Sequence, residues 1–114
     1  HIFDFNSVSL LNSCGIREWI RFVEKLGSDV KIIYRNCPPI VVLQMNMVKG
    51  FLSENATVES FYAPYYDDEN DQELKVLLQS KEVKDLHAPE KLSDAGKPLE
   101  FDGVEATYFR FLNR

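Results

Sequence analysis

The chain has 114 residues, of which 45% are hydrophobic, so it can bury the core of one domain of ordinary size. Its formal net charge is −5 and its Lys and Arg residues are scattered, whereas a nucleic-acid binder shows a basic face. No apolar run approaches the roughly 20 residues that span a bilayer, and no signal peptide is visible. We therefore expect a cytoplasmic protein without nucleic-acid or membrane partners. Because the chain begins with His1, we interpret it as a fragment or as carrying an added first residue.

The first half of the chain alternates between strand and helix patterns. Apolar residues over 2–5 and 8–11 are typical of an extended segment that is buried on both faces. The polar turn Asn12-Ser13-Cys14-Gly15 opens into a helix predicted over 15–26, where apolar residues recur at helical spacing. The next predicted elements are a strand over 30–34, a helix over 39–48 and a strand over 56–62. A strand, a helix and a strand within about 30 residues form a βαβ unit, so we expect these strands to be parallel.

The second half differs in character, and we place a subdomain edge near Pro64. The predicted elements here are a short strand over 73–78, a polar loop over 79–97, an extended segment over 98–101 and a short helix over 103–112. The predicted fold is α/β, with a mixed β-sheet flanked by helices and a small C-terminal β-hairpin and helix. It divides into a β-α-β-α-β core over 1–63 and a tail over 64–114. We expect Trp19, Met45, Met47 and the aromatic residues of the last helix in the core.

The sequence shows no set of residues that points to catalysis. Cys14 and Cys37 are too few for a disulfide framework, so we expect two separate reduced thiols. No His lies near Cys14 in the sequence to act as a base, and there is neither a G-x-G-x-x-G motif nor a phosphate-binding P-loop. We therefore expect no enzymatic activity, no cofactor and no metal.

Ser13 is the strongest candidate for a functional residue, because it stands at the start of the first predicted helix. That end of a helix carries roughly +0.5 of a charge and unpaired N–H groups, so it favours a phosphate or an acidic group of a partner. The alternative is that Ser13 only caps the helix.

The residues around this turn resemble those of a known family. Phe3-Asp4-Phe5 with Val8, followed by Asn12-Ser13-Cys14-Gly15-Ile16, is similar to the STAS domain of bacterial anti-sigma-factor antagonists. That family has an apolar strand, a D-S-[ST]-G-[LIV] turn and a helix. The resemblance continues through the strand at 30–34, the turn at 36–39 and the helix at 43–48, and it covers roughly residues 2 to 62.

The resemblance implies a signalling module that is switched by phosphorylation of Ser13. In the family, a partner serine kinase that also acts as an anti-sigma factor phosphorylates this serine, and the added charge breaks the complex. Asn12 stands where the family has an aspartate, and Cys14 stands where it has a second hydroxyl. The implied partner-binding residues lie in the turn and on the exposed side of the following helix. They are Asn12, Ser13, Cys14, Gly15, Arg17, Glu18 and Arg21.

The tail resembles that of STAS-like bacterial proteins that carry a zinc ribbon. It shares Tyr62-Ala63-Pro64-Tyr65-Tyr66, a Leu-Glu-Phe-Asp segment over 99–102 and a Tyr-Phe-x-Phe-Leu end over 108–112. The family's four cysteines correspond here to residues that are not thiols. These are Asp67, Asn70, Leu92 and Ala95. Because a structural zinc site needs four Cys or His ligands, we expect no zinc and a tail held by aromatic packing.

Two alternative functions remain open at this level. The family has one or two strands before the position of Ile2, and an open sheet edge there would favour pairing with another chain. The first alternative is therefore a structural or scaffold subunit, or a homodimer, without a phosphorylation switch. The second is a small-ligand or cation sensor that uses the tail. Acidic residues are concentrated over 67–73, but this tract does not match an EF-hand. Counting from Asp67, Gln72 and Leu78 stand where that loop needs Gly and Glu. His87 has no second ligand at suitable spacing, and we expect it to be exposed.

Overall fold

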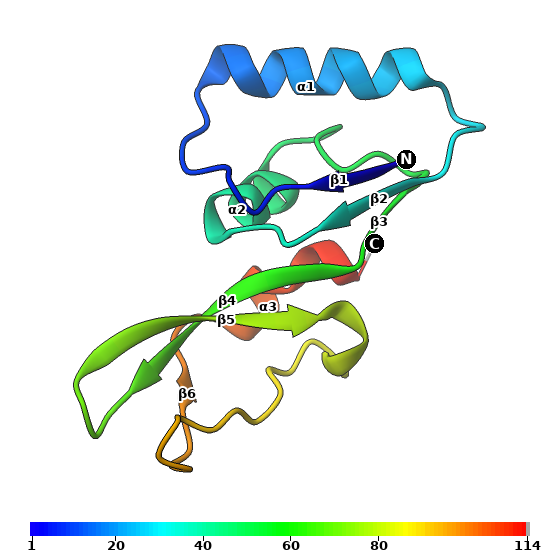
Figure 1. Cartoon of the computed structure of the whole chain (residues 1–114). Coiled ribbons are helices and arrows are strands. Elements are labelled where there is room, and N and C mark those ends of the chain that lie inside the picture. Colours follow the sequence, from blue (N-terminus) through cyan, green and yellow to red (C-terminus); the bar gives the residue numbers. More distant parts are fainter. Residues whose placement is uncertain (114) are drawn as a thin grey trace.

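Three short strands in the first half pair into a parallel sheet, as the βαβ pattern predicted (Figure 1). The structure is a computed structural model that describes residues 1–113. The strands of this sheet are β1 (Ile2–Asp4), β2 (Ile32–Arg35) and β3 (Ala56–Val58), in the order β1-β2-β3. Two helices, α1 (Ser13–Leu26) and α2 (Pro39–Met47), lie in the connections between successive strands. The fold therefore belongs to the α/β class.

Helix α1 is fastened to the parallel sheet through Trp19. The indole lies edge-on to Phe3 and Phe5, with ring centroids 5.1 and 5.3 Å apart. Its Nε1 donates a hydrogen bond of 2.9 Å to the hydroxyl of Tyr34, which in turn donates one of 2.6 Å to the carbonyl of Phe51. Because the Tyr34 side chain is completely buried, this chain of hydrogen bonds satisfies polar groups that water cannot reach.

The second half forms an antiparallel sheet around a hairpin. Strands β4 (Ser60–Asp67) and β5 (Gln72–Gln79) pair along their whole length, and β6 (Glu100–Phe101) pairs with the other edge of β4, so the order is β5-β4-β6. The remaining elements are short helices. They are the 3-10 helix η1 (Ser80–Glu82), α3 (Glu105–Tyr108) and the 3-10 helix η2 (Arg110–Leu112).

The strands form two separate sheets rather than the single mixed sheet that the sequence suggested. The chain changes sheet at Glu59, so the predicted strand over 56–62 is divided between β3 and β4, and the predicted boundary at residue 63 lies inside β4. The Cys37 amide donates to the Ser60 carbonyl at 3.2 Å, and the Tyr62 amide donates to the Cys37 carbonyl at 2.8 Å. These bonds hold the start of β4 beside the end of β2. The division of the chain into two domains stays a prediction.

The expectation of a buried strand continuing to Leu11 is wrong. Strand β1 ends at Asp4, because the Asp4 carboxylate accepts a hydrogen bond from the Asn6 amide at 2.9 Å and closes a local turn. The following connection over 5–12 leaves Leu10 84% exposed. Strand β1 is also not buried on both faces, since Ile2 is 53% exposed on the side away from α1.

The C-terminal segment is held against α2 by the side chain of Asn46. Its Nδ2 donates to the carbonyl of Tyr108 at 2.9 Å, and its Oδ1 accepts from the amide of Phe111 at 2.8 Å. The predicted last helix is therefore two short turns, which place Phe109 and Phe111 in the core. The prediction that both methionines lie in the core is confirmed for Met45, which is buried, and wrong for Met47, which is 72% exposed.

We predict that Tyr34→Phe lowers the free energy of unfolding by about 1–3 kcal/mol, because the Trp19 N–H and the Phe51 carbonyl lose their shared partner. Urea denaturation measures the change. The matched control is Tyr66→Phe, since the Tyr66 hydroxyl contacts Asp71 at the surface; there we expect a change within about 0.5 kcal/mol. Equal effects of the two substitutions would show that the buried hydroxyl does not stabilise the docking of α1.

Candidate functional site

The turn before α1 is organised by Asn12. Its backbone is extended, with φ −113° and ψ 169°, and its Oδ1 accepts a hydrogen bond of 2.7 Å from the Gly15 amide. Asn12 is thus the N-cap residue of α1, and the alternative that Ser13 caps the helix is wrong. A Cβ atom at Gly15 would lie 3.4 Å from the Asn12 Oδ1, so a residue without a side chain suits this tight turn.

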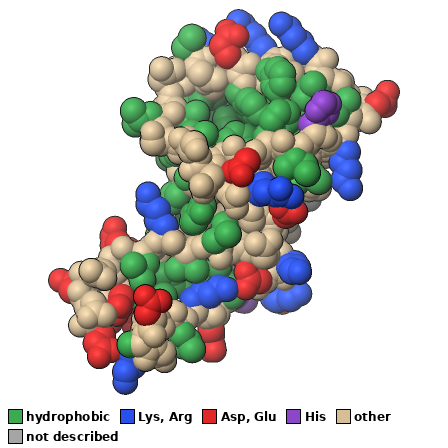
Figure 2. Space-filling view, in the orientation of Figure 1, with side chains coloured by type: hydrophobic (Ala, Val, Ile, Leu, Met, Phe, Trp, Pro, Cys, Tyr) green, Lys and Arg blue, Asp and Glu red, His purple; other side chains and the backbone are tan. Residues whose placement is uncertain are grey.

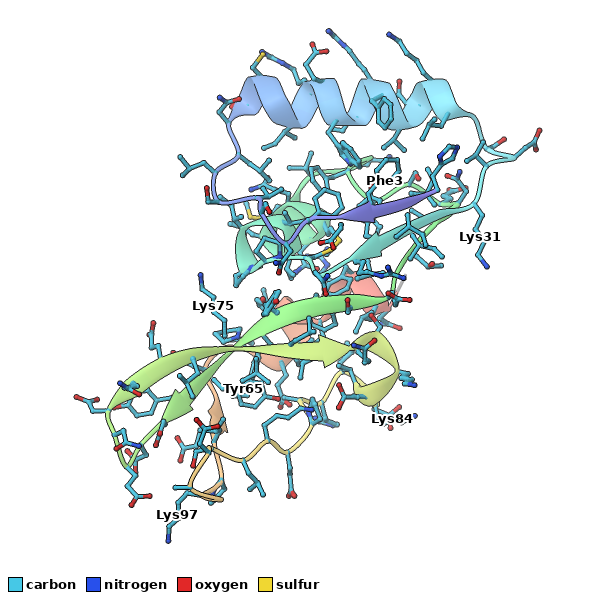
Figure 3. The ribbon with its side chains drawn as sticks, viewed as in Figure 1. Phe3, Lys31, Tyr65, Lys75, Lys84 and Lys97 are labelled. Atoms are coloured by element: carbon cyan, nitrogen blue, oxygen red, sulfur yellow. The ribbon has the colours of Figure 1, made fainter. Side chains whose placement is uncertain are left out.

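Ser13 is the first residue of α1, and its side chain is exposed. Its hydroxyl has no hydrogen-bond partner among residues 1–113. The other residues of the predicted partner-binding surface are exposed as well, so the structure brings all of them to one accessible end and side of α1. They are Asn12, Cys14, Gly15, Arg17, Glu18 and Arg21. The outer side chains of α1 point away from the sheet (Figure 3).

The charges on this side of α1 favour a negative group at residue 13. The first turn of the helix contains no acidic residue, so nothing offsets the positive end of the helix dipole. Arg17 lies one turn after Ser13, at the spacing at which helical side chains meet. Glu18 and Arg21 form an ion pair of 3.2 Å with side chains 64% and 65% exposed, so the pair contributes little to stability.

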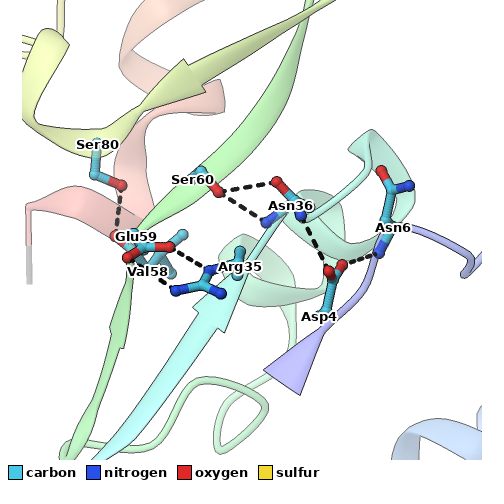
Figure 4. A network of polar contacts seen from close by, with 8 residues as sticks. All are labelled: Asp4, Asn6, Arg35, Asn36, Val58, Glu59, Ser60 and Ser80. Atoms are coloured by element: carbon cyan, nitrogen blue, oxygen red, sulfur yellow. Dashed lines mark hydrogen bonds and ion pairs between the residues drawn. The ribbon is translucent and has the colours of Figure 1, made fainter. Parts of the chain in front are cut away.

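A second group of polar residues lies at the carboxyl ends of β1 and β2 (Figure 4). Asn36 has a left-handed backbone with φ 55°, and its Nδ2 donates to the Asp4 carboxylate at 3.2 Å. The backbone N–H of Asn36 donates a hydrogen bond of 2.9 Å to the hydroxyl of Ser60. Beside them, Arg35 contacts Glu59 through Nε at 2.5 Å and Nη2 at 3.3 Å. The hydrogen bond between them raises the pKa of Arg35 and lowers that of Glu59.

No pattern in the sequence identified this network as a unit. Asn36 forms hydrogen bonds with both Asp4 and Ser60. The network therefore joins the two sheets and does not present a free binding group. One sequence signal could have indicated this network: Asn36 stands directly after a strand and shortly before two prolines. Asn tolerates a left-handed backbone better than most residues, so a tight turn is expected at this position.

The four tail positions that the resemblance equates with cysteines all line one surface cavity of about 480 Å³, beside β5 and the segment around Leu92. Asp67 is 5% exposed and accepts a hydrogen bond of 2.8 Å from the side chain of Asn70, which lowers its pKa. Within residues 1–113, no group of three or more His, Cys, Asp or Glu side chains could hold a metal ion. His87 is exposed, as expected, and lies 3.6 Å from Glu105.

Comparisons with protein-family models, with curated proteins and with solved structures found no match to this chain. No helix in the described part of the chain has the length and apolar character needed to cross a membrane. The resemblance to STAS domains therefore rests on the residues of the sequence, and what it implies about function remains a proposal.

The two thiols should differ sharply in reactivity. Cys14 is exposed, whereas Cys37 is fully buried, and burial followed by the nearby Asp4 carboxylate raises the Cys37 pKa to about 12. We predict that Ellman's reagent modifies one thiol per native chain at pH 8 and both after unfolding. In Cys14→Ser protein, no thiol should react before unfolding. Rapid modification of Cys37 in that native variant would contradict the placement of this residue.

The raised pKa of Cys37 also sets the sign of its contribution to stability. The unfolded chain loses the thiol proton near the ordinary value of 9.0, before the folded chain does. The contribution of Cys37 is therefore fully present below about pH 9 and is lost as the pH rises towards about 12.

Proposed function

We propose that the protein is a non-enzymatic signalling module that binds a protein partner through the N-terminal end of α1 and is released when Ser13 is phosphorylated. The observation that carries this proposal is the exposed Ser13 hydroxyl, which has no partner among residues 1–113 because Asn12 caps the helix instead. The resemblance to anti-sigma-factor antagonists supports the same residue, and it indicates a serine kinase or anti-sigma factor as the partner.

The chain itself can accept a phosphate at this residue. A phosphoserine carries a charge of about −1.5 to −2 at neutral pH. At Ser13 it would meet the unpaired N–H groups of the helix end and the guanidinium of Arg17 one turn away. Asn12 caps the helix without a charge, so it adds no repulsion beside the phosphate. The new charge therefore acts mainly on the partner, whose contact surface must be desolvated when it binds.

The test uses the purified chain as bait in extracts of the cells that contain it, with Ser13→Ala, Ser13→Asp and Ser28→Asp as variants. Ser28 is exposed two residues after the last residue of α1, so Ser28→Asp adds the same charge beyond the opposite end of the helix, away from Ser13. We expect a partner that the original chain and Ser13→Ala capture equally. Ser13→Asp should weaken its binding by about tenfold or more, while Ser28→Asp should not.

Retention of every captured protein by Ser13→Asp would overturn the phosphorylation switch. Binding that is indifferent to all substitutions at Ser13 would favour the structural or scaffold role instead. Mass spectrometry of the chain isolated from its own cells supplies a direct measurement, because a phosphate on the peptide that contains Ser13 is the modification that the proposal requires.

A further inference from the structure

Strand β5 is an open edge of the antiparallel sheet. It pairs with β4 on one side, in a register that places Phe61 opposite Leu78 and Tyr65 opposite Leu74. The Ser80 amide continues this ladder by donating to the Glu59 carbonyl at 2.9 Å. Hydrogen-bonded pairs alternate in an antiparallel ladder, so the even-numbered residues of β5 bond to β4. The odd-numbered residues turn their N–H and C=O groups outward.

The other edge of β4 confirms this alternation. The Asp102 amide donates to the Pro64 carbonyl at 2.9 Å, so even-numbered residues of β4 face β6 and odd-numbered residues face β5. The backbone groups of Glu73 and Lys75 consequently face away from the sheet. Within residues 1–113 they have no backbone partner.

The side chains along this edge are divided between two faces. Leu74, Val76 and Leu78 lie on the face that carries the buried Phe61 and Tyr65 of β4. Glu73 and Lys75 lie on the other face, where both are exposed. Neither makes an ion pair or a side-chain hydrogen bond within the described chain. The open edge therefore presents one free acid and one free base, two residues apart.

We propose that this edge pairs antiparallel with β5 of a second copy of the chain, about a two-fold axis at Leu74. In that register, Glu73 of each copy lies opposite Lys75 of the other, and the two residues exchange both N–H···O bonds through their outward backbone groups. The side chains of such a pair lie on the same face of the joined sheet. Both Glu73–Lys75 pairs therefore bring opposite charges together.

Charge selects this register over its neighbours. An axis at Lys75 would place two lysines opposite each other, and an axis at Glu73 would place two glutamates opposite each other, which destabilises strand pairing. An unpaired edge with a lone lysine resists association. Here the neighbouring glutamate makes the edge complementary to itself, so the surface fits a second copy better than an unrelated strand.

The dimer would leave the outer side of α1 free, while Lys75 lies beside Val8 and Ser9 of the connection that leads to this helix. Helix α1 lies at one end of the molecule and the β4–β5 hairpin at the other (Figure 1). Acidic side chains gather around the tip of the hairpin (Figure 2), and Asp68, Glu69 and Asp71 belong to this turn. In the register centred on Leu74, Asp71 lies opposite Leu77 of the second copy, so the acidic turns of the two copies do not face each other.

Charge reversal tests the proposal by sedimentation equilibrium over a range of protein concentrations. We expect a monomer–dimer equilibrium, weakened by about tenfold or more in Glu73→Lys and in Lys75→Glu. The double variant E73K/K75E restores opposite charges and should recover the dimer. Lys84→Glu is the matched control, because it reverses the charge of an exposed lysine away from this edge. A chain that stays monomeric, or a dimer that none of these substitutions changes, would overturn the proposal.

Cysteine cross-linking tests the register. Opposite residues of a non-hydrogen-bonded pair have Cα atoms about 4.5 Å apart, within the range of a disulfide. Leu74→Cys in a Cys14→Ser background should therefore form a disulfide-linked dimer on mild oxidation. Leu77→Cys in the same background should not, since the two copies of residue 77 would lie about 20 Å apart. Preferential cross-linking at residue 77 would exclude the axis at Leu74.

Discussion

The crossing of the chain between its two sheets, at Glu59 and Ser60, is the constraint on which the rest of the structure depends. Short strands are stable only when their sheet has a hydrophobic face or packs against other elements. Ser60 is 2% exposed, and its hydroxyl both accepts from the Asn36 amide and donates to the Asn36 side chain, at 2.9 and 3.3 Å. Together with the backbone bonds from Cys37 to Ser60 and Tyr62, on either side of Phe61, this crossing lets both sheets contribute to one continuous hydrophobic cluster.

The position of α1 follows from this shared core. The helix needs only one face of the parallel sheet, which it contacts through Trp19, while α2 packs on β4 and the C-terminal turns. The polar side of α1 is therefore left without a neighbouring element. An exposed helix end of this kind suits recognition by another protein, because its charges and unpaired N–H groups are fixed by the fold before the partner arrives.

The molecule is elongated, with extents of 47 × 27 × 22 Å, and the two surfaces to which we assign interactions lie on different elements. The end of α1 carries a single hydroxyl whose modification would change a local charge. The edge of β5 offers backbone groups and paired charges that suit a strand. Helix α1 and the tip of the hairpin lie at opposite ends of the molecule (Figure 1). Lys75 lies nearer to the first half, where it lines a surface cavity together with Val8 and Ser9.

The sequence by itself determined the local elements and the exposure of the Ser13 turn, because hydrophobic spacing and capping residues act over a few neighbouring positions. It therefore predicted α1, α2, the parallel strands and the accessible residues of the Ser13 turn and of the outer side of α1. Only the tertiary structure decided that the chain changes sheet at Glu59 and that residues 8–11 lie outside a strand. It also decided that β5 keeps an open edge, since these features depend on hydrogen bonds between residues far apart in the chain.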